Sequence, residues 1–303
     1  MSPVLGPDVY HGNLDLVPAA RIAADPRFGF VIMKATEGTR YSWAETWLPQ
    51  NWRAVGDTRL ARGAYHYLLF REPGKEQAEF YLESVDGAGG FADGDLHPIF
   101  DVEWKLNEGV GKDVILDCIS DFVSVIHAEG HKVIRYGRSL FRDLSIATDT
   151  GAEFGWIPRY NDELGPTDDI GFAEPDMWQY TNGVFNFTSM PNAAPGMRPG
   201  DVNVVLTDLA RLTRSGVEPA GIREMELPAE APHRPTPATW TDRDWEALAD
   251  HLPRLTEEEM KVQEFVLGQM DRRFNRPIPG EQGPRRAGWR HEDDLIEVRK
   301  SIE

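Results

Sequence analysis

Eight short runs of β-branched and aromatic residues recur along the first two-thirds of the chain, and stretches of helical periodicity separate most of them. The clearest helical stretch, Lys112 to Glu129, lies between the middle runs, whereas helical stretches are sparse between the last three. Strands that alternate with helices predict a parallel sheet, and eight strands suit a closed barrel. We therefore predict an α/β fold built on an incomplete (β/α) barrel. The runs are Val4 to Tyr10, Phe30 to Ala35, Ala61 to Leu68, Pro98 to Val102, Lys132 to Tyr136, Gly155 to Tyr160, Asp176 to Tyr180 and Val202 to Leu206.

The composition changes after the last run. Pro and Gly punctuate Ser215 to Ala238, which is typical of a linker or an extended segment. Beyond it, Thr256 and Glu259 have the spacing of a helix-capping box. We predict three parts: a barrel at 1–214, a Pro-rich linker at 215–239 and a small, mainly helical C-terminal region at 240–303. Its helices are expected at Asp242 to Leu252, Glu257 to Phe274 and Arg290 to Ile302.

Charge and cysteine content exclude several classes of function. The formal net charge of -18 disfavours binding to phosphate backbones, so we expect no nucleic-acid partner. Cys118 is the only cysteine, which leaves no intrachain disulfide and no multi-thiolate zinc site, and we expect it to pack inside a helix. No window approaches the ~20 apolar residues of a membrane span, and no early segment has the pattern of a signal peptide. We therefore expect no membrane insertion, and delivery to any external substrate by another agent.

The strongest local feature is His97 to Trp104, where an apolar strand ends in two acids separated by one residue. Because side chains alternate along a strand, Asp101 and Glu103 should point to the same side, with Cα atoms roughly 6 to 7 Å apart. Crowding of like charges at the carboxyl end of a barrel strand would keep a proton on one acid, as glycoside hydrolysis requires. The alternative is a chance Asp-x-Glu at a solvated strand end.

Two further acids occupy matching places. Asp8 follows the first run, and Asp201 opens the last one. A closed barrel brings its first and last strands together, so four carboxylates would converge at one mouth. The alternative is that each is a turn or cap residue, because Asp after Pro or Gly is common there.

Aromatic residues recur at the same expected rim. Aromatic faces stack against sugar rings, although such residues also fill barrel cores. Glu37, before Gly38, is either a further acid of the pocket or a surface turn residue, and we favour the pocket. The aromatic residues are Tyr65, Tyr67, Tyr136, Trp156, Tyr160, Trp178 and Tyr180.

Taken in order, seven segments resemble glycoside hydrolase family 25, the Chalaropsis-type lysozymes common among bacteriophage endolysins and bacterial autolysins. The resemblance covers roughly Val4 to Leu212 and does not extend to the C-terminal region. The segments are Asp8 to Val9, Phe30 to Thr39, Gly63 to Tyr67, Phe100 to Glu103, Arg135 to Gly137, Trp178 to Thr181 and Asp201 to Asn203.

The resemblance implies a flattened, TIM-like (β/α)5β3 barrel that cleaves the β-1,4 bond from N-acetylmuramic acid to N-acetylglucosamine in bacterial peptidoglycan. Glu103 corresponds to the general acid, assisted by Asp101. In this family the N-acetyl group of the substrate has been proposed as the nucleophile, so either that group or Asp101 attacks the sugar. The resemblance implies no metal and no organic cofactor.

The remaining roles also follow from the resemblance. Asp8 and Asp201 would complete the catalytic acids and tune the charge of the pocket. The substrate-binding residues would be Glu37, Tyr65, Tyr67, Tyr136, Trp178 and Gln179.

The chain departs from the family pattern in two places. The family usually carries Ser after the Asp-Val pair, whereas Tyr10 and His11 follow it here, and we expect both near the mouth. The stretch Gly183 to Pro199 is longer than usual and is expected to form an extra rim loop.

Two functional hypotheses remain open: a working muramidase, or a catalytically weak or inactive lysozyme-fold module with a structural or wall-binding role in a phage particle. The four acids favour the enzyme, because a binding module has no need to crowd like charges. For the C-terminal region we expect self-association or attachment to a phage structural protein, the alternative being helices that pack only on the barrel. The expected setting is a phage-encoded lysin that stays in the host cytoplasm until lysis or travels on a virion, and that acts at the bacterial cell wall.

Overall fold

The computed structural model describes residues 4–12, 16–42, 46–146, 150–160, 175–184, 186, 188 and 190–217. The chain divides into two compact units, Met1–His233 and Arg234–Glu303. The predicted helical region at 240–303 and the linker from 218 onward lie outside the described residues, and those assignments stay predictions.

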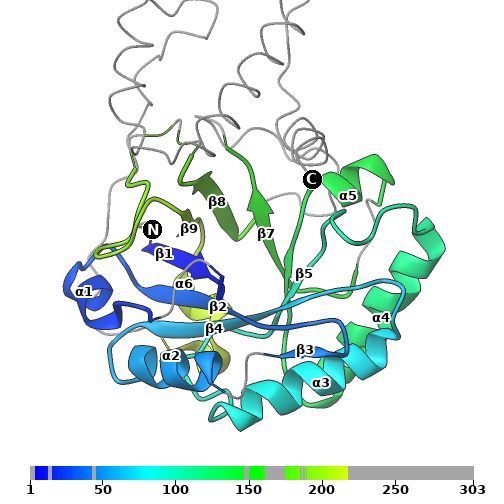
Figure 1. Ribbon diagram of the computed structural model, residues 1–303, viewed down its shortest axis with the longest axis horizontal. Helices are drawn as coiled ribbons and strands as arrows, with labels where there is room; N and C mark the ends of the chain where they lie inside the picture. The colour runs from blue at the N-terminus through cyan, green and yellow to red at the C-terminus, as the bar shows by residue number, and fades with distance from the viewer. Residues whose placement is uncertain are drawn as a thin grey trace, which may run out of the picture. The chain divides into compact units, whose positions relative to one another are not determined.

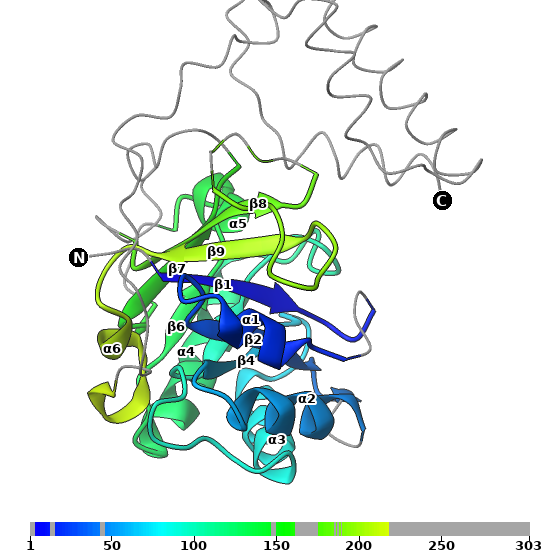
Figure 2. The same cartoon turned by 90° about the vertical axis from the view of Figure 1, so that its left-hand side faces the viewer.

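The strands of the first unit form a closed barrel. Their order is β1-β9-β8-β7-β6-β5-β4-β2, and pairing of β1 with β2 closes the ring. The strands from β1 to β8 around the ring are parallel, whereas β9 runs antiparallel to both of its neighbours, β8 and β1 (Figure 2). The strands are β1 (Val4–Val9), β2 (Phe30–Glu37), β4 (Ala61–Tyr67), β5 (Ile99–Asp101), β6 (Ile134–Tyr136), β7 (Phe154–Pro158), β8 (Met177–Asn182) and β9 (Asp201–Val205).

Helices follow the first five strands of the ring and lie outside it (Figure 1). The predicted (β/α)5β3 barrel is confirmed, and all eight predicted strands are present. The helix predicted at Lys112 to Glu129 is α4, and Cys118 is buried in it as expected. The sequence analysis missed β3 (Tyr41–Ser42), a two-residue strand antiparallel to the end of β2. The helices are α1 (Ala19–Ala24), α2 (Trp47–Gly56), α3 (Gly74–Gly87), α4 (Lys112–Ala128), α5 (Ser139–Asp143) and, after β9, α6 (Leu209–Leu212).

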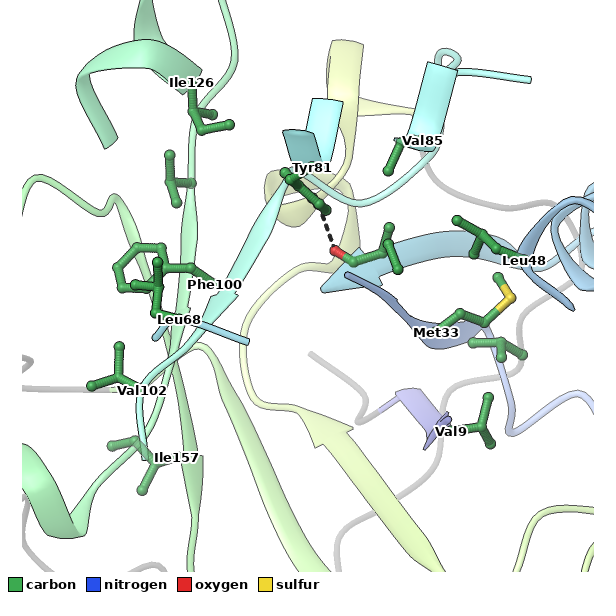
Figure 3. Close-up of a cluster of buried hydrophobic side chains, with 14 of the residues drawn as sticks. Val9, Met33, Leu48, Leu68, Tyr81, Val85, Phe100, Val102, Ile126 and Ile157 are labelled. Carbon is green, nitrogen blue, oxygen red and sulfur yellow. Dashed lines mark hydrogen bonds between the residues drawn. The ribbon is translucent and has the colours of Figure 1, made fainter. Parts of the chain in front are cut away.

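Alternation along the strands produces two separate hydrophobic clusters. The inner cluster fills the barrel and includes Phe30, Ile99 and Trp156. The outer cluster lies between the strands and the helices, with Phe100 and Phe122 among its members (Figure 3). Neighbours in sequence thus belong to different cores, as period-two alternation requires.

A series of hydrogen-bonded polar side chains crosses the outer cluster between β4 and α3. The ring of His66 is hydrogen-bonded to Thr36 Oγ1 at 2.7 Å and to Gln77 Oε1 at 3.1 Å. Burial lowers the pKa of His66 to about 3, so this histidine is neutral at physiological pH. Close by, the Tyr81 hydroxyl donates to the Ala64 carbonyl at 2.7 Å (Figure 3). These bonds tie β4 to its covering helix through side chains.

The amino ends of the strands are closed by the segment that follows α6. The Arg214 amide donates to the Asp95 carbonyl at 2.7 Å, and the Asp95 carboxylate pairs with Arg62 at 2.6 Å. Ser215, where the linker was predicted to begin, still bonds to the Asp93 carboxylate at 2.5 Å. The open end of the barrel is therefore the carboxyl end of its parallel strands. Across the described segments, no helix has the length and apolar character needed to span a bilayer.

Phe122 offers a direct test of the outer core. Its ring is fully buried and lies against Phe100 and His66, with centroid separations of 5.8 and 5.1 Å. We expect Phe122→Ala to lower the free energy of unfolding by about 3 to 5 kcal/mol, because it removes buried apolar surface and leaves a cavity. Urea denaturation would measure this. Val114→Ala on the same helix is the control: Val114 is exposed, and the change should stay within about 0.5 kcal/mol.

Candidate active site

Two buried aspartates, a partly buried aspartate and a partly exposed glutamate meet at the carboxyl end of the barrel strands. Asp8 lies near the end of β1, Asp101 ends β5 and Asp201 opens β9. Because β9 is antiparallel, its first residue lies at the same end as the last residues of the other strands, and Asp201 pairs with Asn182 at the end of β8. The charges of Asp8 and Glu103 both act on Asp201. The structure thus brings the four predicted acids together.

Asp101 ends β5, and Glu103 lies just beyond the strand, close enough for its charge to act on Asp101. Asp101 lies between Tyr67 of β4 and Tyr136 of β6 in the sheet register. Its Oδ1 atom is buried and has no hydrogen-bond partner within the described part of the chain. Glu103 follows two residues later and is only partly buried. One carboxyl is therefore held inside the barrel, and the other reaches its rim.

The loop that carries Glu103 is anchored at several points. Asn107 is fully buried, and its amide donates to the Leu68 carbonyl at 2.8 Å and to the Glu103 carbonyl at 3.0 Å. The Tyr67 hydroxyl donates to the Lys105 carbonyl at 2.5 Å. The sequence analysis missed Asn107. The only available signal in the sequence was an asparagine four residues after a candidate acid, in a segment without helical periodicity.

Burial and mutual repulsion govern the ionisation of the aspartates. The pKa of Asp101 is raised well above its ordinary value, first by burial and then by the charge of Glu103. The pKa of Asp201 is raised well above its ordinary value by burial, then by Asp8 and Glu103. Burial also raises the pKa of Asp8, although hydrogen bonds from Asn203 and Gln179 oppose it. The site therefore retains protons that isolated carboxyls would release, and can donate one.

Lys34 supplies a positive charge that the sequence analysis missed. Lys34 lies opposite Tyr65 and continues the inward-facing series of Phe30 and Ile32. A bulge in β2 between Lys34 and Thr36 then turns Glu37, opposite Tyr67, to the same face. Lys34 Nζ pairs with Glu37 Oε2 at 2.5 Å. The Lys34 charge opposes the rise in the pKa of Asp101. A lysine within an apolar run was the available signal.

Asp8 is held by two amide side chains. Gln179 Nε2 and Asn203 Nδ2 donate to Asp8 Oδ2 at 2.9 and 2.8 Å. The Gln179 carbonyl oxygen accepts the hydroxyls of Tyr136 at 3.0 Å and Tyr160 at 2.7 Å. Gln179 faces Asn203 across the β8–β9 pair, so the two strands present their amides together.

The other predicted binding residues divide between the two faces of the barrel. Tyr65 packs against the inner cluster, and its pKa is raised by burial and then by the charges of all four acids. Tyr67 is buried, and Lys34 lies over its ring with Nζ 4.7 Å from the centroid. Trp178 belongs to the outer cluster, where its indole donates to the Arg159 carbonyl at 2.6 Å. The structure therefore does not bring Trp178 to the acids, because it alternates with the inward-facing Gln179.

The two segments that depart from the family pattern, Tyr10–His11 and the described part of Gly183 to Pro199, lie in different parts of the barrel. Tyr10 is exposed, and His11 lies close enough to Lys34 and Glu37 for their charges to act on it. In the described part of Gly183 to Pro199, Met190 and Ala194 pack in the outer cluster, and Pro191 accepts the Tyr180 hydroxyl at 2.5 Å. This part of the loop covers the outside of β8.

Comparison with known proteins identifies the barrel. The model of the glycosyl hydrolases family 25 matches residues 18–186, more than half of the 303-residue chain. The chain belongs to this family. The matched range ends before β9 and begins after β1, so the placement of Asp8 and Asp201 beside the family 25 segment comes from the structure.

Relatives of known sequence and structure share this family 25 region. The chain is 25% identical over 157 residues to the uncharacterized protein YegX of Escherichia coli K12, covering 52% of this chain and 54% of that protein, so it spans about half the length of the curated relatives it matches. A family 25 glycosyl hydrolase from Bacillus anthracis is 25% identical, with a TM-score of 0.53 over 67% of this chain and 89% of that one. A muramidase from Trichobolus zukalii, at 23% identity, has the same fold, with a TM-score of 0.56 over 69% of this chain and 96% of that one.

The acid cluster of this family 25 barrel is not arranged as a metal site. Within the described ranges, no group of three or more His, Cys, Asp or Glu side chains could hold a metal ion.

The raised pKa of Asp101 predicts a pH-dependent stability difference. Between the ordinary and the raised pKa, the folded protein holds a proton that the unfolded chain has released, so this group destabilises the fold increasingly as pH rises. An asparagine at position 101 does not ionise and therefore does not destabilise the fold as pH rises. We expect Asp101→Asn to match wild type near pH 4 and to exceed it progressively toward pH 8, by about 1.4 kcal/mol per unit of pKa shift.

Urea denaturation across this pH range measures the difference. Asp57→Asn, which removes an exposed carboxylate at the end of α2, is the matched control for an Asp-to-Asn change outside the acid cluster. A stability difference for Asp101→Asn that stays flat with pH would contradict the prediction.

Proposed function

We propose that the barrel hydrolyses the β-1,4 bond from N-acetylmuramic acid to N-acetylglucosamine in bacterial peptidoglycan, with Glu103 as the general acid. The observation that carries this proposal is that the charges of Glu103 and Asp8 both act on Asp101, and that the same two charges act on Asp201 as well. Two carboxyls of unequal burial suit the two roles of glycoside hydrolysis. Membership of family 25 supports the reaction class.

In the proposed reaction, Glu103 donates its proton to the glycosidic oxygen as the bond from C1 of muramic acid breaks. Its partial exposure lets it reach an oxygen between two sugar rings, whereas the buried Asp101 cannot extend as far. Asp101 Oδ1 is available to accept the N–H of the substrate N-acetyl group, whose carbonyl oxygen then attacks C1. Water opens the resulting ring, and Glu103 recovers its proton from that water.

The surrounding side chains prepare the site for this chemistry. Asp8 and Asp201 add negative charge that stabilises an oxocarbenium-like transition state. Tyr65, Tyr67 and Tyr136 line the mouth from β4 and β6. Glu37 is engaged by Lys34, so we assign it to charge balance at the mouth rather than to direct contact with the sugar.

The proposal is tested by digesting purified peptidoglycan with wild type and Glu103→Gln, followed by borohydride reduction and mass spectrometry of the new reducing ends. We expect reduced muramic acid from the wild type and a loss of rate of about 10²- to 10⁴-fold in the variant, the usual contribution of a general acid. Glu83→Gln is the control, because Glu83 is exposed on α3 and its loss should leave the rate unchanged.

Each alternative result has a definite meaning. Reduced glucosamine would assign the other glycosidic bond. No new reducing ends across several wall types would favour a structural or wall-binding module.

For the biological setting we propose a phage-encoded lysin whose C-terminal region mediates assembly, as its helical pattern with interspersed aromatic residues suggests. Analytical ultracentrifugation of the full chain and of a 1–217 truncation tests self-association. Identical monomeric behaviour of both, together with absence of the protein from purified virions, would contradict this part.

A further inference from the structure

A continuous set of hydrogen bonds connects Asp8 to three aromatic side chains, Tyr136 of β6, Trp156 of β7 and Tyr160, which follows β7. We call Gln179 and Asn203, the two side chains in the middle of this set, the amide pair. Both donate to the same oxygen, Asp8 Oδ2. The amide pair is buried, at 3% and 0% exposure, so water does not compete for these bonds.

The orientation of Asn203 follows from Trp156. An indole N–H can only donate, and Trp156 Nε1 lies 2.9 Å from Asn203 Oδ1. The Asn203 carbonyl must therefore face Trp156, which turns its amide nitrogen toward Asp8 Oδ2 at 2.8 Å and the Gly6 carbonyl at 3.1 Å. A flipped Asn203 would face the indole N–H with its own amide donor and lose this bond.

The orientation of Gln179 follows from two tyrosines. Its Oε1 accepts hydroxyls from Tyr136 and Tyr160, which occupy both lone pairs of the amide oxygen. Its Nε2 is then directed to Asp8. Gln179 and Tyr136 were predicted to bind substrate, but their polar atoms are committed to this network.

Two N–H donors on one carboxyl oxygen stabilise the ionised carboxylate over the protonated acid. In the described part of the chain, three other titratable groups interact directly with Asp8: Asp101 of β5, Asp201 of β9 and Tyr65 of β4. The charged and titratable groups that face these three or one another in turn are Glu103, Lys34, Glu37, Tyr67 and His11.

We propose that Gln179 and Asn203, oriented by Tyr136, Tyr160 and Trp156, are positioning residues that keep Asp8 ionised, so that the proton of the acid cluster stays on the neighbours of Asp8. As an assignment of roles within catalysis, this inference rests on the proposed function. The charge of Asp8 raises the pKa of both Asp101 and Asp201. Burial raises the pKa of Asp8 itself, and the hydrogen bonds from the amide pair oppose that rise.

The first test needs no activity. Carbon-13 NMR of the aspartate carboxyls, with the Asp8 signal assigned from Asp8→Asn, follows the ionisation of Asp8 in wild type, Trp156→Phe and Gln179→Met. A hydrogen bond to a charged group shifts its pKa by about one to two units. We therefore expect the midpoint of the Asp8 titration to move to higher pH by about that amount in both variants. Trp52→Phe is the control, because it removes an indole N–H bonded to the Gly90 carbonyl, away from the network.

The second test uses the pH profile of kcat/KM on soluble glycan strands. If Asp8 must be ionised, the acidic limb of Trp156→Phe and Gln179→Met should move to higher pH while the alkaline limb stays in place. A purely structural defect would lower the whole profile without moving either limb, as we expect at most for Trp52→Phe.

The outcomes separate this inference from the proposed function. An Asp8 titration that is unchanged in both folded variants would overturn the positioning role, whatever the activity. A shifted titration without any wild-type hydrolysis would keep the network and overturn the muramidase. Since Gln179→Met leaves the packing of Trp156 intact, misfolding of Trp156→Phe alone would not remove the test.

Discussion

The crowding of buried carboxyls at the mouth of the barrel is the constraint on which the rest of this structure depends. Asp8 and Asp101 are nearly inaccessible to water and Asp201 is partly buried, and the charge of Asp8 acts on both of the other aspartates. An isolated buried charge is costly, so such a cluster persists only with compensation. The barrel provides it from three directions: a lysine from β2, amides from β8 and β9, and protons that the acids themselves retain.

The two faces of the strands separate this chemistry from the stability of the fold. Inward-facing positions of β1, β5, β8 and β9 carry the acids and amides at the mouth, above the inner apolar cluster. Outward-facing positions of the same strands pack under the helices. Because the outer cluster holds the strands in place, the mouth can keep its strained charge arrangement without loss of the barrel.

Much of the fold followed from local patterns. Each of the eight strands and the long helix α4 showed its periodicity within a single segment. The order of the acids along those strands was also sufficient to expect Asp8 beside Asp201, since closure joins the first strand to the last. The local patterns did not show which face of a strand is turned to the interior, so the inward-facing Lys34 was missed and the outward-facing Trp178 was assigned to the pocket.

The sequence by itself determined the strands, their helices and the four acids, because period-two and helical patterns and the Asp-x-Glu spacing are properties of short segments. Only the tertiary structure decided which groups surround each acid. The charge of Lys34 acts on Asp101 because β2 and β5 belong to one closed ring, and Asn203 faces Asp8 because an indole from β7 fixes its carbonyl. These relations join residues far apart in the chain, with up to 195 positions between Asp8 and Asn203, and they exist only once the ring of strands has closed.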